Sequence, residues 1–135
     1  LKHVAWARGF RYHKVAIETP DSVIADSKEL YQILQPSLEK INLKEYFSEK
    51  ISFVKYSKDI KEYVINALCP PGDKNKIWKV IYHEEIGKIV VLVDNSVLGL
   101  FIGKGGENCL TASKLCGLEV EIKGISSSVY EMFTK

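Results

Sequence analysis

Residues 96–114 read SVLGLFIGKGGENCLTASK, and this stretch decides the fold. An apolar run ends in the glycine-rich segment Gly103–Gly106 and a second amphipathic run follows at once, which predicts helix, tight loop, helix. Glycine permits positive φ, so the loop backbone can approach a ligand closely. The unpaired N–H groups at the start of the second helix favour an anion, and Lys104 adds positive charge at the same place. The stretch therefore predicts a phosphate-binding loop.

The spacing of the glycines distinguishes between kinds of phosphate site. A nucleoside-triphosphate loop requires G-x-x-x-x-G-K followed by Ser or Thr, but Gly99 to Gly103 is one residue short and Gly105 occupies the hydroxyl position. A dinucleotide fingerprint requires a glycine where Asn108 stands. The remaining interpretation is the G-x-x-G loop of a KH domain, which holds the backbone of about four nucleotides of single-stranded RNA. A glycine-rich turn without a ligand is the alternative.

The composition is that of an ordinary globular chain. Its 135 residues suffice for one domain or two small ones. No apolar run approaches the length of a membrane span, and no signal peptide is visible. Cys69, Cys109 and Cys116 lack metal-binding spacing, so we expect free thiols in a reducing, cytoplasmic environment, with no metal site and no cofactor. The first residue is not methionine, which suggests an excised fragment.

The same order of elements is predicted twice along the chain. In each copy two strands are followed by helix, loop, helix and a third strand. The helix Ser57–Leu68, which Ser57 can cap, precedes the second copy. The sequence therefore predicts a first unit at 1–56, a second unit at 57–124 and a C-terminal tail at 125–135. We expect strands at residues 1–7, 13–18, 51–54, 76–82, 88–93 and 118–122.

The first unit has a degenerate loop. Gln35-Pro36-Ser37-Leu38 stands where the second unit has Gly103–Gly106. Pro36 has no N–H to donate, and the side chains of Gln35 and Leu38 keep a sugar-phosphate chain at a distance. We therefore expect the first unit to act chiefly as a packing partner.

With these motifs the chain resembles the tandem KH region of the NusA family of bacterial transcription termination/antitermination factors. The resemblance rests on VKYSKD at 54–59, EYVINALCP at 62–70, IGKGGEN at 102–108 and ASKLCG at 112–117. It implies an α+β fold of two tandem type II (prokaryotic) KH domains, each a small three-stranded sheet packed on helices. It also implies binding of nascent single-stranded RNA within an RNA polymerase transcription complex. We expect a monomer without catalytic activity.

The predicted RNA site combines the glycine loop with an apolar groove and a basic hairpin. The glycines would allow close approach, the lysine would supply charge, and Val120 to Ile122 would form the far wall of the groove. The predicted residues of the second unit are Leu98, Ile102, Gly103, Lys104, Gly105, Gly106, Asn108, Cys109, Val120 and Ile122. In the first hairpin, Arg8, Arg11 and Lys14 would contact phosphates; ordinary solubilising charge is the alternative there.

Two rival functions belong to other classes. A KH-fold scaffold for protein interactions in a transcription or ribosomal assembly, with weak RNA binding, is favoured by the degenerate first loop and by a net charge of only +2. An enzyme that holds a nucleotide at Gly103 and Lys104 lacks any pattern for a general base or for Mg²⁺ ligands. The sequence therefore favours RNA binding and predicts no catalytic residues.

Overall fold

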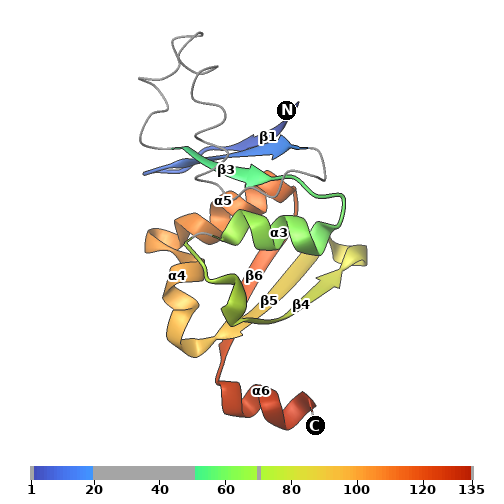
Figure 1. Ribbon diagram of the computed structural model, residues 1–135, viewed down its shortest axis with the longest axis vertical. Helices are drawn as coiled ribbons and strands as arrows, with labels where there is room; N and C mark the ends of the chain where they lie inside the picture. The colour runs from blue at the N-terminus through green and yellow to red at the C-terminus, as the bar shows by residue number, and fades with distance from the viewer. Residues whose placement is uncertain (1, 20–50, 70, 135) are drawn as a thin grey trace.

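The chain forms two three-stranded sheets with helices between them (Figure 1). The computed structural model describes residues 2–19, 51–69 and 71–134. The predicted loop Gln35–Leu38 and the helices expected on either side of it lie outside the described residues. The two sheets and their helices confirm the predicted α+β class with KH-type units. The unit boundaries at 1–56, 57–124 and 125–135 stay a prediction.

The first sheet contains β1 (Lys2–Ala7), β2 (His13–Glu18) and β3 (Ile51–Lys55), in that order. β1 and β2 form an antiparallel hairpin, and β3 runs parallel to β2. Its buried small residues, Ala7 and Ala16, rest against the helices of the second unit. Small side chains let the sheet approach these helices closely, so the two units share one core.

The second unit runs in the order helix, two strands, two helices, strand. Its elements are α3 (Ile60–Leu68), β4 (Ile77–His83), β5 (Lys88–Asp94), α4 (Leu98–Ile102), α5 (Glu107–Cys116) and β6 (Glu119–Ile125). The sheet order is β4-β5-β6, with β4 and β5 antiparallel and β5 and β6 parallel. This repeats the hairpin-plus-parallel-strand topology of the first sheet. Single 3₁₀ turns lie at Lys74–Lys76 (η1), Glu84–Ile86 (η2), Asn95–Val97 (η3) and Lys104–Gly106 (η4).

The helix α3 begins at a polar cap and buries one apolar stripe. Asp59 is its N-cap, and the Asp59 carboxylate accepts a hydrogen bond from Lys61 N at 3.1 Å. The sequence predicted Ser57 in this role; instead Ser57 Oγ accepts from Asp59 N at 3.2 Å, one step earlier in the turn. The buried residues Tyr63, Val64, Ala67 and Leu68 follow at helical spacing and face the core.

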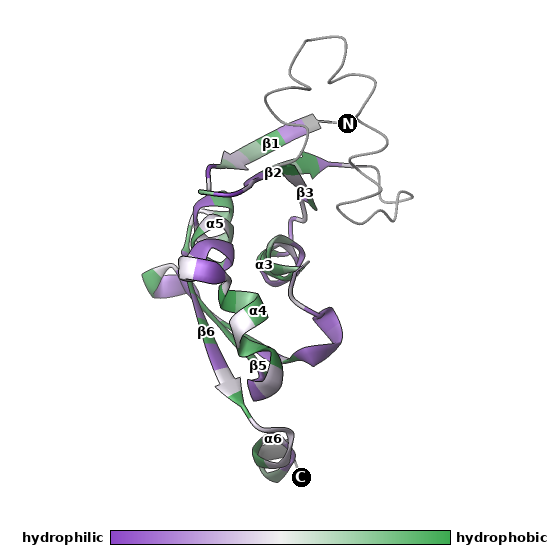
Figure 2. Cartoon of the chain, turned by 90° about the vertical axis from the view of Figure 1, so that its left-hand side faces the viewer, coloured by the Kyte–Doolittle hydropathy of each residue, from purple (hydrophilic) through white to green (hydrophobic). Residues whose placement is uncertain are grey.

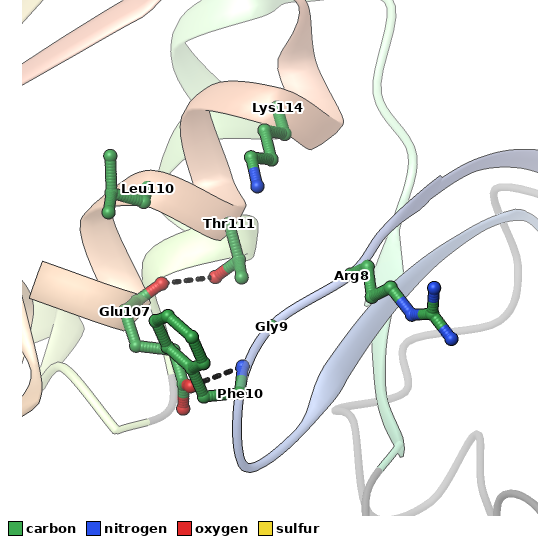
Figure 3. A pocket seen from close by; sticks show the side chains of 7 residues that line it. All are labelled: Arg8, Gly9, Phe10, Glu107, Leu110, Thr111 and Lys114. Carbon is green, nitrogen blue, oxygen red and sulfur yellow. Dashed lines mark hydrogen bonds between the residues drawn. The ribbon is translucent and has the colours of Figure 1, made fainter.

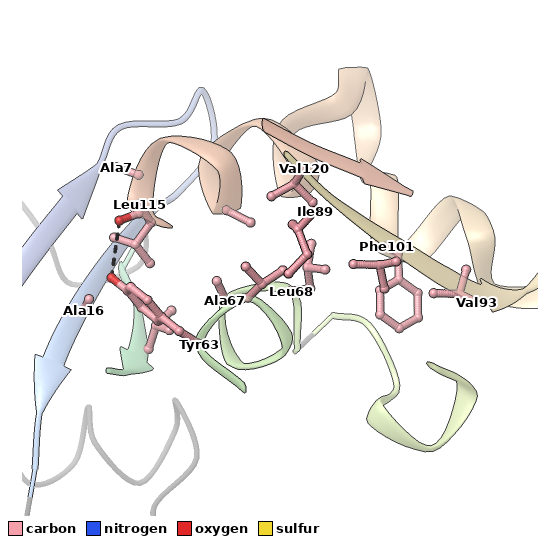
Figure 4. Close-up of a cluster of buried hydrophobic side chains, with 14 residues drawn as sticks. Ala7, Ala16, Tyr63, Ala67, Leu68, Ile89, Val93, Phe101, Leu115 and Val120 are labelled. Carbon is pink, nitrogen blue, oxygen red and sulfur yellow. Dashed lines mark hydrogen bonds between the residues drawn. The ribbon is translucent and has the colours of Figure 1, made fainter. Parts of the chain in front are cut away.

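The core lies between α3, α5 and the inner face of the second sheet (Figure 4). Leu68, Ile89 and Phe101 are completely buried there. A Cβ placed on Gly72 would lie 2.5 Å from the Phe101 ring, so only glycine fits beneath that ring. Figure 2 shows the hydrophobic colour concentrated on β5 and α4. The apolar strands and the short helix α4 therefore anchor the glycine loop that follows α4.

The predicted C-terminal tail contains a further helix, α6 (Ser127–Thr134). Ser126 Oγ accepts a hydrogen bond from Val129 N at 3.2 Å, and the Tyr130 ring stacks on Trp78 with centroids 5.5 Å apart. Within residues 2–19, 51–69 and 71–134, no helix has both the length and the apolar character needed to cross a bilayer.

Candidate nucleic-acid interface

The loop between α4 and α5 requires glycine at three of its four positions. Gly103, Gly105 and Gly106 have φ values of 80°, 64° and 77°, in the region that L side chains rarely adopt. Gly103 N donates to Gly99 O at 2.9 Å, which ends α4, and Gly106 N donates to Gly103 O at 3.1 Å. The glycines therefore turn the chain sharply from one helix into the next.

The three glycines have different surroundings. A Cβ on Gly103 would lie 2.8 Å from Asn108 N, so the loop packs tightly on the start of α5 at this position. A Cβ on Gly105 would meet no atom within 4 Å, and both Lys104 and Gly105 are exposed. The tip of the loop is therefore open to a ligand, whereas its base is closed against the helix.

The electrostatics at this tip favour an anion. The loop ends at the N-terminus of the ten-residue helix α5, whose N-cap Gly106 provides no side-chain hydrogen bond to the first amides. Lys104 adds a positive charge. Glu107 is in the first turn, but its side chain points towards the first hairpin and is only 2% exposed.

Four of the predicted groove residues lie beside the loop in a partly buried layer. Leu98 from α4, Cys109 from α5 and Ile122 from β6 are half-buried and pack against the core. Ile102, the last residue of α4, is half-buried directly before the loop. Cys109 Sγ donates to Val120 O at 3.2 Å, which joins α5 to β6. Burial raises the pKa of the Cys109 thiol, which therefore stays neutral. The structure thus places Leu98 and Cys109 beside β6, the strand that carries Ile122.

Val120 differs from its predicted role. Its side chain is 7% exposed and belongs to the core, so it cannot form the wall of a groove. β6 is an edge strand, because it comes last in the sheet order. Without Val120, the wall of the predicted groove would consist of the β6 backbone and the half-buried side chain of Ile122.

Asn108 also differs from its predicted role. It is completely buried, and its Nδ2 donates to Leu68 O at 3.1 Å and to Phe101 O at 2.7 Å. Its Oδ1 accepts from Tyr12 OH at 3.3 Å. These partners occupy both ends of the amide, so the Asn108 side chain holds α3, α4 and the hairpin together and does not face a ligand.

Lys14 is the clearest correction in the first hairpin. It was predicted to contact phosphates, but it is completely buried. Its Nζ donates to Ala67 O at 2.6 Å, to Asn108 O at 3.0 Å and to Asn108 Oδ1 at 2.5 Å. Burial lowers the pKa of the Lys14 ammonium group to about 7. This side chain fastens the first sheet to α3 and α5.

The two arginines of the hairpin remain at the surface. Arg8 is exposed at the end of β1. The side chain of Arg11 is 58% exposed, and its Nε lies 3.4 Å from Glu107 Oε1. The guanidinium group of Arg11 is therefore exposed on one side while it faces a buried carboxylate on the other, so it can approach a phosphate and keep this partner.

Glu107 is a site residue that the sequence did not reveal. Its Oε2 accepts hydrogen bonds from Phe10 N at 2.6 Å and from Arg11 N at 2.8 Å (the first is drawn in Figure 3). A glutamate directly after a glycine loop is expected in solvent, and the hairpin amides that it binds lie almost a hundred residues away in the chain. No local pattern could have identified this contact. Glu107 fixes the hairpin beside the loop.

Catalysis and metal binding have no comparable support. Among the described residues, no group of three or more His, Cys, Asp or Glu side chains is placed to hold a metal ion. The free cysteines Cys69, Cys109 and Cys116 are partly buried. The pKa of Cys69 is raised to about 11 and that of Cys116 to about 12, chiefly by burial, so neither thiol is an activated nucleophile.

Comparison with known proteins places this geometry in a family. The model of the NusA-like second KH domain matches residues 60–129, which contain the glycine loop. The transcription termination/antitermination protein NusA of Bacillus subtilis is 35% identical over 125 residues, which are 91% of this chain and 32% of that protein. The NusA protein of Halalkalibacterium halodurans is 42% identical over 80 residues, 59% of this chain and 20% of that protein. The chain thus spans a third or less of these curated relatives.

A solved structure shares the fold. The structure described as "Crystal structure of APE1850" aligns with a TM-score of 0.52 and 24% sequence identity. The alignment covers 84% of this chain and 79% of that one. The likeness is therefore one of fold.

Proposed function

Because the chain belongs to the family of NusA-like second KH domains, we propose that it binds single-stranded RNA through the loop Gly103–Gly106. The observation that carries this proposal is the open tip of the loop: Lys104 and Gly105 are exposed, and nothing lies within 4 Å of a Cβ on Gly105. A sugar-phosphate backbone can therefore reach the loop amides and the N-terminus of α5.

The proposed contacts divide into a phosphate clamp and a groove for bases. Gly103, Lys104, Gly105 and Gly106 form the clamp. Leu98, Ile102, Cys109 and Ile122 line the groove, with the backbone of β6 as its far wall. Arg8 and Arg11 add phosphate contacts from the first hairpin. Lys14, Asn108 and Val120 are excluded from this set because their side chains are buried in the structure.

The wider role is inferred from the relatives. Those proteins carry the name transcription termination/antitermination protein. By extension, this chain acts on nascent RNA together with RNA polymerase in the cytoplasm, as a monomer. Its part is binding without catalysis, which agrees with its membership of a KH family.

The test is a pair of variants with the same change in net charge. Lys104→Asp with Gly105→Asp places two carboxylates at the tip of the loop, and aspartate tolerates the positive φ of Gly105. The matched control is Lys79→Asp with Gly87→Asp, which changes an exposed lysine and an open positive-φ glycine on the β4–β5 hairpin. Fluorescence anisotropy with fluorescein-labelled single-stranded RNA should show binding lost in the first variant and kept in the second. Equal binding by the two variants would refute the clamp.

A protein-interaction scaffold remains the second candidate. The burial of Lys14 favours it, because one cation of a chain with a net charge of only +2 is withdrawn from the surface. RNA titration at two salt concentrations separates the two functions. An RNA clamp loses affinity as salt rises, whereas a scaffold shows RNA binding too weak to measure at either salt concentration.

A further inference from the structure

A groove lies between the first hairpin and the exposed side of α5 (Figure 3). Its volume is about 300 Å³, and both units contribute to its lining. Arg8 and Phe10 come from the hairpin, and Glu107, Leu110, Thr111 and Lys114 come from α5. We propose that this groove holds one nucleobase of an RNA strand that continues beyond the loop Gly103–Gly106. The proposal rests on the RNA-binding function proposed above and extends it by one nucleotide site.

The walls of the groove suit a flat apolar ring. Phe10 is 88% exposed and Leu110 is 53% exposed, although both are large hydrophobic residues. An exposed aromatic ring on a turn offers a face on which a base of any sequence can stack. A leucine opposite that ring completes an apolar slot. Stacking of a base would remove both side chains from water, which supplies the driving force.

The groove is continuous with the phosphate clamp. A Cβ on Gly106 would lie 3.7 Å from Leu110 Cδ1, so Leu110 lies beside the end of the loop. Glu107, the next lining residue, directly follows Gly106 in the chain. A G-x-x-G loop holds about four nucleotides. A longer strand therefore meets this groove as it leaves the clamp over α5.

The charges at the groove complement a phosphate. Lys114 lies on α5 one turn after Leu110 and supplies the positive charge, whereas Arg8 lines the opposite wall with its guanidinium group directed away from α5 in Figure 3. The one carboxylate in the lining, Glu107, is 2% exposed and is engaged by Phe10 N, Arg11 N and Arg11 Nε. It therefore presents little negative charge to a ligand.

The same carboxylate fixes the aromatic platform in advance. Glu107 Oε2 holds the backbone N–H of Phe10 at 2.6 Å, so the turn that carries the ring is tied to α5 before any RNA arrives. A preformed site loses less conformational entropy on binding than a loop that must first become ordered. The Phe10 ring itself remains outside the core, which makes it a safe position for substitution.

The experiment compares two RNA lengths. Fluorescein-labelled single-stranded RNA pools of randomised sequence, four and ten nucleotides long, are titrated with the 135-residue chain and its variants. Phe10→Ser should weaken binding of the ten-nucleotide pool about fivefold or more and that of the four-nucleotide pool less than about twofold, since base–aromatic stacking is lost only in the longer complex. Phe10→Tyr should retain binding. Lys114→Gln should make the slope of log K against log salt concentration less steep by about 0.7 for the longer pool, because one phosphate contact is lost.

Controls separate this proposal from the function on which it rests. Met132→Ser on α6 removes a side chain that is 77% exposed and should leave both pools unaffected. The clamp variant, Lys104→Asp with Gly105→Asp, should bind neither pool. If it does while Phe10→Ser binds the longer pool within about twofold of the unchanged chain, the groove proposal alone fails. An equal loss on both pools in Phe10→Ser would also overturn it, because Phe10 would then act through the clamp. A chain that binds neither pool overturns both proposals.

Discussion

Lys14 places an ammonium group between the two units, where the structure leaves it no exposed surface. Its three N–H groups meet three oxygen acceptors, yet burial holds its pKa at about 7, below the ordinary value of 10.5. Between these two pH values the unfolded chain carries a proton that the folded chain releases. The free energy of unfolding should therefore rise as the pH increases from 7, with a slope of at most about 1.4 kcal/mol per pH unit from this group.

Urea unfolding at several pH values between 6 and 9 measures this effect. The Lys14→Met variant replaces the ammonium group by an apolar side chain of similar length and should show a flatter profile over the same range. Above about pH 9 the trend should reverse, because burial raises the pKa of Cys69 and Cys116 and the unfolded thiols ionise first. A profile in Lys14→Met as steep as that of the unchanged chain would mean that another group titrates.

The loop glycines allow a second test at the scale of single residues. Gly105→Ala has open space around its Cβ, so only the positive φ opposes it, at a cost of about 1–2 kcal/mol. Gly103→Ala adds a clash with the backbone at Asn108 N, 2.8 Å away, and should destabilise the fold by a further 1–3 kcal/mol or so. Chemical denaturation of the two variants gives the comparison. Equal losses would show that the loop base is not packed as tightly as the structure has it.

At the scale of elements, the start of α5 determines where the first hairpin lies. The Glu107 carboxylate binds two consecutive hairpin amides, so its loss leaves two partly buried donors without an acceptor. Glu107→Ala should cost about 2–3 kcal/mol of stability and accelerate hydrogen exchange at the Phe10 and Arg11 amides. Glu107→Gln keeps an acceptor oxygen at the same place and serves as the control. Unchanged exchange in Glu107→Ala would show that other contacts hold the hairpin.

At the scale of the whole molecule, the positive charge is modest and local. The net charge is only +2, and Lys14 is withdrawn into the core. The proposed clamp, together with the small hairpin patch, would neutralise few phosphates. For two to four contacts, the slope of log K against log salt should be roughly −1.5 to −3. Anisotropy titrations over a range of salt concentrations measure it, and a much steeper slope would require a larger basic surface than the described residues provide.

The sequence by itself determined the elements and the glycine loop. The stripe of α3, the apolar run of β5 and the positive φ of Gly103, Gly105 and Gly106 depend on residues a few positions apart. Apolar periodicity shows which face of a helix or strand is buried. The spacing of glycines shows where the backbone needs a positive φ. For the same reason the order of strands, which the two sheets repeat, could be predicted from the sequence.

Only the tertiary structure decided which of the predicted polar site residues are buried. Lys14 and Asn108 were predicted to contact RNA, but they bind each other across 94 residues of chain and are completely buried. Glu107 follows the glycine loop without any local signal for burial, yet its carboxylate binds Phe10 N, 97 residues away. A lysine in a hairpin and an asparagine after a glycine loop have the same local pattern whether they meet a phosphate or each other. Their surroundings come from packing one unit on the other, and no pattern within either unit encodes that contact.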